Sequence, residues 1–139
     1  MLTLKLFKED YINDAYLNWF KDKGFTEYLE VDGITKQQAI EHYRQCKING
    51  SFFYAIFLSG EHIGNIKLNA DNDLSTIIFP PYQGRGYATQ AIKIILAAVN
   101  VSKITAGIRS GNIGSLKAYQ NAGFKIVGNT QDIIHLLCK

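Results

Sequence analysis

The segment FPPYQGRGYATQAI, residues 79–92, restricts the fold of this chain more than any other part of it. Two consecutive prolines lack a backbone N–H, so a strand that ends at Phe79 cannot continue pairing with a sheet neighbour through them. Gly84 and Gly86 then allow positive φ and the close approach of another molecule. An apolar helical pattern starts directly after this turn. The sequence therefore predicts a strand that stops or leaves its sheet, followed by a glycine turn and a helix.

The start of that helix is suited to an anion. The first amides of a helix have no intrahelical partner, and the positive end of the helix dipole lies there. Free N–H groups beside two glycines match a phosphate or a pyrophosphate. Two nucleotide motifs do not fit, because the Gly-Lys-Ser/Thr ending of a P-loop is missing and Thr89 replaces the third glycine of the dinucleotide fingerprint. A plain strand-to-helix connection without a ligand is the alternative.

The rest of the chain alternates strand and helix patterns, which predicts an α/β fold with a mixed sheet in a single domain, residues 1–139. Strands are predicted over residues 2–6, 51–58, 63–70, 74–79, 101–108, 124–128 and 132–138. Helices are predicted over residues 9–20, 36–46, 88–98 and 113–121.

Several residues define the predicted ends and faces of these helices. Lys23 and Gly24 break the first helical pattern, and Thr35 is a candidate N-cap for the second. Gly123 is expected in the left-handed conformation that ends the last helix, with Phe124 making the accompanying apolar contact. The inward-facing positions of the helix after the glycine turn are Ala91, Ile92, Ile95 and Ala98.

Composition and charge exclude several classes of protein. With 139 residues, 47% of them hydrophobic, the chain has the size of one ordinary domain. A net charge of +3 without any Lys/Arg run does not favour nucleic-acid binding. No stretch approaches a membrane span or a signal peptide, so a cytoplasmic protein without membrane partners is expected. Cys46 and Cys138 show no metal spacing, which predicts two free thiols and no metal site.

A second motif, SGNIGSLKAYQNAGF at residues 110–124, follows the next predicted strand. Asn112, Ser115 and Tyr119 have i, i+3 and i+7 spacing, which places them on one side of the helix or its first turn. They form a polar stripe. The alternative is that Asn112 only caps the helix while Tyr119 packs with its hydroxyl reaching water.

Together the two segments resemble the GNAT (Gcn5-related N-acetyltransferase) superfamily. The first hallmark, Gln/Arg-x-x-Gly-x-Gly/Ala at the start of a helix, is matched by Gln83, Gly86 and Ala88. The second hallmark is matched by Asn112, Ser115, Tyr119, Gly123 and Phe124. The segment KEDYINDAYLNWFKDKGFTEYLE, residues 8–30, is similar to the first helix and following loop of members that modify ribosomal-protein N-termini, antibiotics or amino sugars. The resemblance implies a mostly antiparallel central sheet that splays between strands four and five, flanked by about four helices.

The resemblance also implies a cofactor site for acetyl-CoA between the two splayed strands. Amides of Arg85, Gly86, Tyr87 and Ala88 would hold the pyrophosphate, with Gln83 and Gly84 shaping the turn, while the Arg85 side chain either approaches a phosphate or is solvated. A backbone N–H near Ile78 or Phe79 would donate to the thioester carbonyl; one such donor is typically worth about 10²-fold to 10³-fold in rate. The cofactor-binding residues implied are Ile78, Phe79, Gln83, Gly84, Arg85, Gly86, Tyr87, Ala88, Asn112 and Ser115.

The implied reaction is direct attack of a primary amine on the thioester, with Tyr119 as the acid that protonates the leaving thiolate. The central strands contain no carboxylate, so the nominations for the base are Glu30, Glu61 and His135, with a water chain as the alternative. The expected acceptor is a small-molecule amine, such as an amino sugar, or a peptide N-terminus. Its candidate lining residues are Trp19, Phe20, Phe25, Tyr28 and Glu30.

The sequence is also compatible with two other functions. One is a non-catalytic acyl-CoA-binding sensor on the same fold, which is consistent with the missing strand carboxylate but which Tyr119 argues against. The other is a phosphate- or nucleotide-binding module of a different α/β fold. The expected assembly is a monomer or a homodimer.

Overall fold

The computed structural model of the protein describes residues 1–27, 29 and 33–138. The strands are β1 (Leu2–Leu6), β2 (Phe52–Leu58), β3 (Glu61–Leu68), β4 (Leu74–Ile78), β5 (Ile104–Arg109), β6 (Lys125–Thr130) and β7 (Ile133–Cys138). The α-helices are α1 (Asp14–Trp19), α2 (Lys23–Thr26), α3 (Lys36–Ile48), α4 (Tyr87–Ala98) and α5 (Ile113–Asn121). Two 3₁₀ turns, η1 (Glu9–Tyr11) and η2 (Pro80–Tyr82), complete these elements. The mixed α/β class is confirmed.

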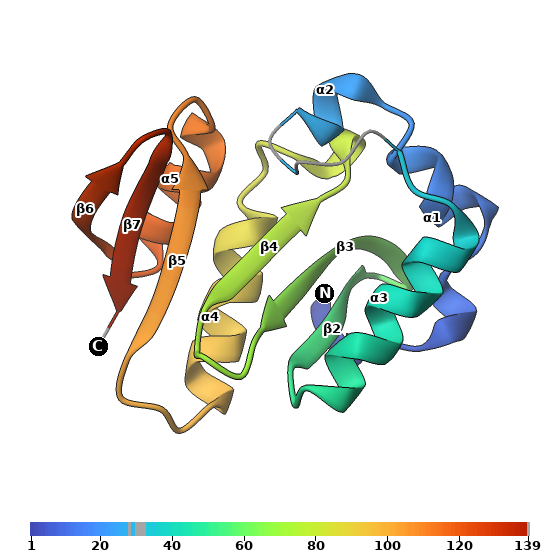
Figure 1. Ribbon diagram of the computed structural model, residues 1–139, viewed down its shortest axis with the longest axis horizontal. Helices are drawn as coiled ribbons and strands as arrows, with labels where there is room; N and C mark the ends of the chain where they lie inside the picture. Colours follow the sequence, from blue (N-terminus) through green and yellow to red (C-terminus); the bar gives the residue numbers. More distant parts are fainter. Residues whose placement is uncertain (28, 30–32, 139) are drawn as a thin grey trace.

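The strands form two antiparallel sheets, in the orders β1-β2-β3-β4 and β5-β7-β6. They meet where β4 and β5 begin, because Asp73 and Thr105 form a parallel bridge there. Thr105 N–H donates to the Asn72 carbonyl over 2.9 Å, and its hydroxyl donates to the Asp73 carboxylate over 2.7 Å. Beyond this point β4 and β5 diverge toward their carboxyl ends (Figure 1). The predicted splay between strands four and five is therefore confirmed.

Helices cover both faces of the four-stranded sheet. In Figure 1, α4 lies behind β4, while α3 lies in front of β2 and β3. The side chains of β4 alternate between two cores: Leu74 and Ile78 join the core beneath α4 and α5, and Ile77 joins a largely aromatic core beneath α1 and α3. The inner face of α4 differs from the prediction at one position, because Ala98 is exposed in its last turn.

Local capping explains where several helices begin and end. Thr35 forms a capping box with Gln38, through bonds of 3.1 and 2.9 Å. At the end of α5, Phe124 N–H donates to the Tyr119 carbonyl, and Gly123, with φ of +107°, donates to the Gln120 carbonyl. These two bonds make a Schellman motif, and the Tyr119 and Phe124 rings complete it with an edge-on contact at 5.0 Å. Both predicted caps are confirmed.

The amino-terminal helices differ from the prediction. The predicted helix over residues 9–20 is divided into η1 and α1, because the Asn13 side chain accepts the Tyr16 N–H over 2.9 Å and starts a new helix. Lys23 and Gly24 lie inside α2, where the Asp22 carboxylate accepts the Phe25 N–H over 3.1 Å. A strong N-cap thus overrides the break that the glycine suggested.

Within the described residues, no helix combines the length and the apolar character needed to cross a membrane. Cys46 and Cys138 are both free thiols, as the sequence predicted. Among the same residues, no three His, Cys, Asp or Glu side chains are grouped in a way that would hold a metal ion.

Candidate active site between β4 and β5

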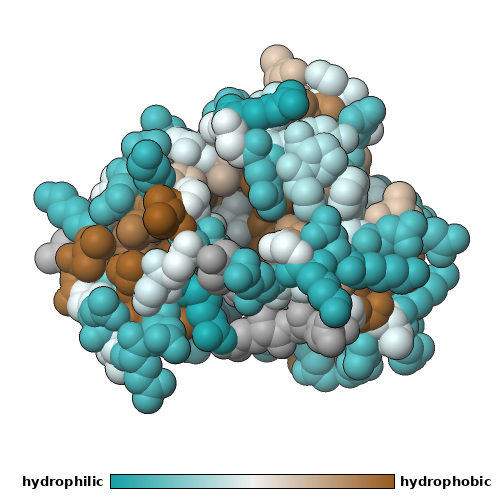
Figure 2. Space-filling view, turned by 90° about the horizontal axis from the view of Figure 1, so that it is seen from above, coloured by the Kyte–Doolittle hydropathy of each residue, from teal (hydrophilic) through white to brown (hydrophobic). Residues whose placement is uncertain are grey.

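Two cavities meet in the gap where β4 and β5 diverge. The larger one, of about 620 Å³, lies on the α3 side of the sheet, and the smaller one, of about 420 Å³, lies beside the glycine turn and α4. Viewed from above, the surface is hollowed between the two halves of the molecule (Figure 2). The described residues that line both cavities are Leu29, Thr76, Ile77, Asn112, Ser115 and Tyr119. A molecule in one cavity can therefore contact a molecule in the other at this junction.

The edge of β4 presents backbone groups to the gap. Phe79 N–H donates to the Ile63 carbonyl over 2.8 Å, and the β3–β4 register pairs Ile78 with Gly64. Because hydrogen-bonded and non-hydrogen-bonded pairs alternate in an antiparallel ladder, the amides of Ile78 and Thr76 point away from β3, toward the gap. Of the two donors that the sequence suggested for the thioester carbonyl, Ile78 thus faces the gap. The Phe79 amide cannot be this donor, because the β3–β4 ladder continues one residue beyond β4 and this amide already donates to Ile63.

The glycine turn leaves a row of backbone amides exposed. Gly84 and Gly86 have φ of +73° and +83°, and Gly86 is the N-cap of α4 without a side-chain cap. The first amide bonded inside α4 is that of Gln90, which donates to the Gly86 carbonyl over 3.1 Å. Within the described part of the chain, the amides of residues 84–89 therefore precede the first helical bond. They form the concave, positively polarised end of a helix.

A side chain fixes the turn to the sheet. The side-chain Nε2 of Gln83 donates to the carbonyl of Ile78 over 2.8 Å. The backbone N–H of Gln83 donates to the carbonyl of Pro80 over 3.2 Å. The bond explains why glutamine stands at the first position of the motif: an uncharged amide can donate to the last carbonyl of β4. The side chain of Arg85 is exposed.

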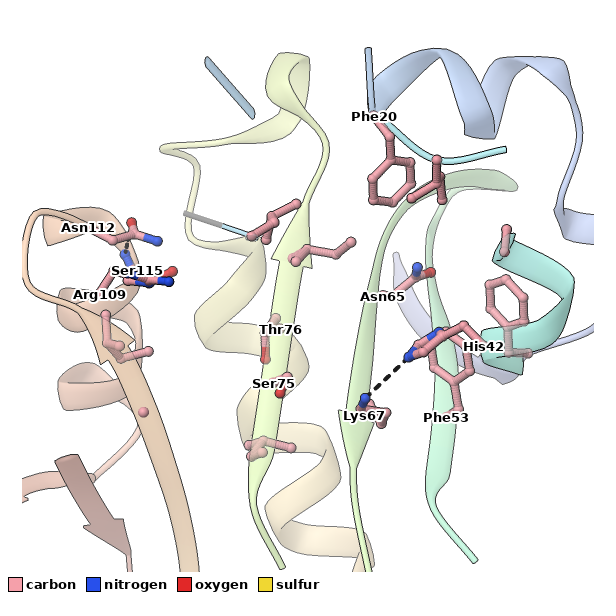
Figure 3. Close-up of a pocket in the computed structure, with 18 of the residues that line it drawn as sticks. Phe20, His42, Phe53, Asn65, Lys67, Ser75, Thr76, Arg109, Asn112 and Ser115 are labelled. Atoms are coloured by element: carbon pink, nitrogen blue, oxygen red, sulfur yellow. Dashed lines mark hydrogen bonds between the residues drawn. The ribbon is translucent and has the colours of Figure 1, made fainter. Parts of the chain in front are cut away.

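The polar stripe of α5 faces the same gap. The Asn112 side chain accepts the Ser115 N–H over 3.3 Å and caps α5, as the capping alternative predicted, and both residues still line both cavities. Figure 3 shows Asn112 and Ser115 on one wall, with Thr76 and Ser75 of β4 opposite them. Asn112 therefore caps the helix and faces the gap at once, and Ser115 faces the gap beside it.

Tyr119 is the most deeply buried member of the stripe, with 1% of its surface exposed. Its hydroxyl lies 3.0 Å from the Thr76 hydroxyl and donates to the Leu74 carbonyl over 3.2 Å. Burial raises the pKa of Tyr119 above the ordinary value of 10, although the Thr76 hydrogen bond lowers it. The phenol therefore stays protonated at neutral pH. The alternative in which this hydroxyl reaches water is wrong, because the structure buries it between α5 and β4.

The nominated bases do not gather at the junction. Glu61 lines neither cavity, although it accepts the hydroxyl of Tyr82, which lines the smaller one, over 2.8 Å. His135 is exposed on β7 and also lines neither cavity. Glu30 and Tyr28 lie outside the described residues. The described lining of the larger cavity contains no carboxylate at all.

The aromatic residues predicted to line the site of the acceptor amine are divided between the core and the cavities. Trp19 stacks on Phe79 with ring centroids 5.5 Å apart, so it belongs to the aromatic core. Phe20 lines the larger cavity and Phe25 the smaller one. Phe79 itself is buried, which places its ring in that core rather than in the gap.

Three basic residues in the larger cavity did not emerge from the sequence. Lys67 of β3, Arg109 of β5 and His42 of α3 all line it. Lys67 Nζ lies 3.4 Å from Nε2 of His42 (Figure 3). Burial, and then the charge of Lys67, lower the pKa of His42 below its ordinary value, so the imidazole is neutral at neutral pH and accepts from the ammonium. These residues come from distant segments, so no sequence motif joins them.

Comparison with known proteins identifies the family. Residues 1–125 match the family described as Acetyltransferase (GNAT) domain, and the chain belongs to this family. The sequence-based prediction of a GNAT acetyltransferase is therefore confirmed. No curated protein matches the chain in sequence.

Several solved structures share the fold. The spermidine N-acetyltransferase of Vibrio cholerae, solved with CoA and spermine, has a TM-score of 0.85 at 20% identity, covering 99% of this chain and 94% of that one. The aminoglycoside acetyltransferase AAC(6')-Ib, solved with coenzyme A and kanamycin, has a TM-score of 0.84 at 17% identity, covering 99% of this chain and 94% of that one. The microcin C7 self-immunity acetyltransferase MccE, solved with acetyl-CoA and AMP, has a TM-score of 0.83 at 14% identity, covering 99% of this chain and 91% of that one. The predicted GNAT fold is confirmed.

Proposed function

We propose that this protein is an acetyl-CoA-dependent N-acetyltransferase that acetylates a primary amine of a small molecule, such as an amino sugar, or of a protein N-terminus. The observation that carries the proposal is the junction of two cavities at Thr76 and Tyr119, between diverging strands. Family membership supports the reaction class. The fold relatives solved with CoA together with spermine or kanamycin support an amine acceptor.

The residues present fit acetyl-CoA. The open amides of residues 85–88 would hold its pyrophosphate, and the amide of Ile78, on the free edge of β4, would donate to its carbonyl oxygen. Asn112 and Ser115 would contact its arm from the opposite wall. When bound, acetyl-CoA supplies an acetyl thioester, from which the amine takes the acetyl group while the thiol leaves with a proton.

Tyr119 remains our candidate for the acid. Its hydroxyl donates to the Leu74 carbonyl at the junction, so turning that O–H toward the gap would present a donor to the departing sulfur. Because burial raises the pKa of Tyr119, the phenol stays protonated across the neutral range. General acid catalysis of this kind is typically worth about 10²-fold to 10⁴-fold.

The acceptor amine must lose its proton before it attacks. Lys67 places positive charge on the wall of the larger cavity. A cationic environment disfavours a second cation, so it lowers the pKa of a bound ammonium and increases the neutral, nucleophilic form. This effect would replace a carboxylate base, and water in the cavity would accept the proton.

A non-catalytic acyl-CoA sensor is the second candidate. The observation that favours it is the Tyr119 hydroxyl, whose proton is already donated to Leu74 in this structure. In such a protein the hydroxyl would only hold α5 against β4. Coenzyme A would bind, but no amine would be acetylated.

The test is an acetylation screen with the full chain. Acetyl-CoA is incubated with a panel of amines, free thiol is measured, and the acetylated product is identified by mass spectrometry. We expect thiol release that depends on both protein and amine. Stabilisation by coenzyme A in a thermal-shift assay, without any product, would support the sensor instead. Stabilisation by ATP or NAD but not by coenzyme A would contradict both.

A further inference from the structure

We propose that the acceptor carries a hydroxyl or carbonyl oxygen close to its reacting amine, and that the Tyr16 hydroxyl donates a hydrogen bond to this oxygen in the larger cavity. The inference rests on the proposed function and specifies its substrate class. Tyr16 of α1 and Asn65 of β3 are both buried, and both line the larger cavity. Neither of them lines the smaller cavity beside the glycine turn.

The first argument is the direction of a hydrogen-bond chain that starts at a backbone carbonyl. Nε2 of His62 lies 3.0 Å from the Gly64 carbonyl, which can only accept, so Nε2 carries the proton. The Asn65 atom that lies 2.8 Å from the same Nε2 is therefore the acceptor, Oδ1. Asn65 Nδ2 in turn donates to the hydroxyl oxygen of Tyr16 over 3.0 Å. That oxygen accepts within the chain, and its own proton remains to be donated.

The second argument is where that proton can go. Within the described part of the chain, Asn65 is the one hydrogen-bond partner of the Tyr16 hydroxyl, and it is a donor. The rings of Phe7, Phe20 and Phe79 pack against Tyr16, with centroids 5.8, 5.2 and 5.9 Å away, and carry no polar atom. Burial raises the pKa of Tyr16 to about 12, so the phenol keeps its proton at neutral pH. The larger cavity is therefore where this O–H meets an acceptor.

A β-bulge in β3 fixes the orientation of this donor. The β2–β3 register shifts at Ile63, which is the extra residue opposite β2. His62 and Asn65 are three residues apart, so simple alternation would place them on opposite faces of the strand. The bulge brings them to the same face, where they bond to each other. Because the chain is already in place, Tyr16 loses less side-chain freedom when a ligand binds.

The third argument is position relative to the junction of the cavities. Asn65 is directly opposite Ile77 in the β3–β4 register, and Ile77 lines both cavities. Side chains of directly opposed residues stand on the same face of a sheet. Figure 3 shows Asn65 on the same wall as Phe20 and Lys67. An amine at the junction and an oxygen bonded to Tyr16 can therefore belong to one small molecule.

This donor distinguishes between classes of amine. An amino sugar and a protein N-terminus both have an oxygen, as hydroxyl or carbonyl, on the carbon next to the one that bears the amine. A polyamine has nitrogens alone, and these are protonated at neutral pH and cannot accept a hydrogen bond. A buried O–H that has lost its contact with water and gains no acceptor disfavours binding. Tyr16 thus favours the two acceptor classes proposed above over polyamines.

The experiment compares matched amines with and without the oxygen. trans-2-Aminocyclohexanol is paired with cyclohexylamine, and glycinamide with isobutylamine, so that hydroxyl and carbonyl are tested separately. The ratio of kcat/KM within each pair is measured for the wild type and for Tyr16→Phe. Differences in amine basicity are the same for both proteins and cancel when the ratios are compared. We expect Tyr16→Phe to lower the ratio of at least one pair by about 3-fold to 10-fold, because a hydrogen bond between uncharged groups is lost.

Two further variants make the test specific. Tyr43→Phe is the control, because it removes the hydroxyl of a half-buried tyrosine in the same aromatic core that lines neither cavity. It should leave both ratios unchanged. In Asn65→Asp the carboxylate would accept the Tyr16 O–H and turn it away from the cavity, so the same ratio should fall although the phenol is kept. All three variants should retain the thermal shift given by coenzyme A, and if Tyr16→Phe loses it, the ratio in Asn65→Asp decides.

Two outcomes would overturn the inference. One is that Tyr16→Phe leaves both ratios unchanged, because the hydroxyl would then only support the fold. The other is an equal fall in Tyr43→Phe, because the effect would then not depend on the cavity. Failure of the wild type to acetylate any amine would instead overturn the proposed function, and the inference with it.

Discussion

The hydroxyl of Tyr119 lies 3.0 Å from the hydroxyl of Thr76, across the gap that separates α5 from β4. The two residues belong to different halves of the molecule, and both line both cavities. The same phenol donates to the Leu74 carbonyl over 3.2 Å. One side chain thus links the two halves at the point where an acetyl group would be transferred.

Replacing Tyr119 by phenylalanine tests both roles of this hydroxyl. We expect kcat to fall by about 10²-fold to 10⁴-fold if the phenol is the acid. The free energy of unfolding should fall by about 1–3 kcal/mol, because the Leu74 carbonyl loses a buried donor. Thr76→Val is the matched control, since it removes the neighbouring hydroxyl but leaves the Tyr119 O–H in place. Steady-state kinetics and urea unfolding measure the two effects, and an unchanged kcat in Tyr119→Phe would refute the acid assignment.

Gly86→Ala tests the glycine turn. A residue with a side chain is disfavoured at φ of +83° by about 1–2 kcal/mol, so the turn should relax and its amides lose their arrangement. We expect weaker binding of coenzyme A in calorimetry. Gly50→Ala is the control, because Gly50 has φ of +78° and open space around it, but lies after α3, away from the turn. Equal loss of coenzyme A affinity in both variants would mean that the turn has no specific role.

The stability of the protein should decrease between pH 7 and pH 5. Burial lowers the pKa of His62, although its hydrogen bonds to Asn65 and to the Gly64 carbonyl raise it. The unfolded chain, with an ordinary pKa of about 6.5, therefore binds the proton more readily than the folded chain. The neutral His62 therefore contributes its full share of the folding free energy above the unfolded pKa of about 6.5. This contribution is lost as the pH falls below about 6.5 and through the lower pKa of the folded state. The pKa of His42 is lowered as well and adds to the same trend.

His62→Gln isolates the contribution of one imidazole. Its melting temperature should change less between pH 7 and pH 5 than that of the wild type, because one titrating group is removed while an amide donor is kept for Asn65. His135→Gln, at an exposed position on β7, should retain the wild-type dependence. An identical change of melting temperature between pH 7 and pH 5 in the wild type and in His62→Gln would show that His62 does not contribute to the pH dependence of stability.

Local patterns account for the features that the sequence predicted well. The two prolines and two glycines define the end of β4 and the start of α4 without reference to any distant residue. The Schellman motif at Gly123 and the capping box at Thr35 likewise depend on residues within one or two turns. The splay of β4 from β5 was expected from the family resemblance, and the prolines lie next to it.

Tertiary contacts account for what the sequence did not reveal. His42 and Lys67 are 25 residues apart, and only the packing of α3 on the sheet brings them together. The Phe79 amide is used because it donates to the Ile63 carbonyl of β3, one residue beyond the last residue of β4. The short helix α2 depends on the cap from Asp22, which outweighs the low helix propensity of Gly24.

The most direct test of the account is the backbone amide spectrum of the ¹⁵N-labelled protein, at 15.6 kDa a convenient size for NMR, during titration with coenzyme A. We predict large shifts for the amides of Gly86, Tyr87, Ala88 and Ile78, with no change at the distant turn around Gly50. Binding that shifts amides elsewhere and leaves these four unchanged, or no binding at millimolar coenzyme A, would contradict the central claim that the gap between β4 and β5 holds the acetyl donor.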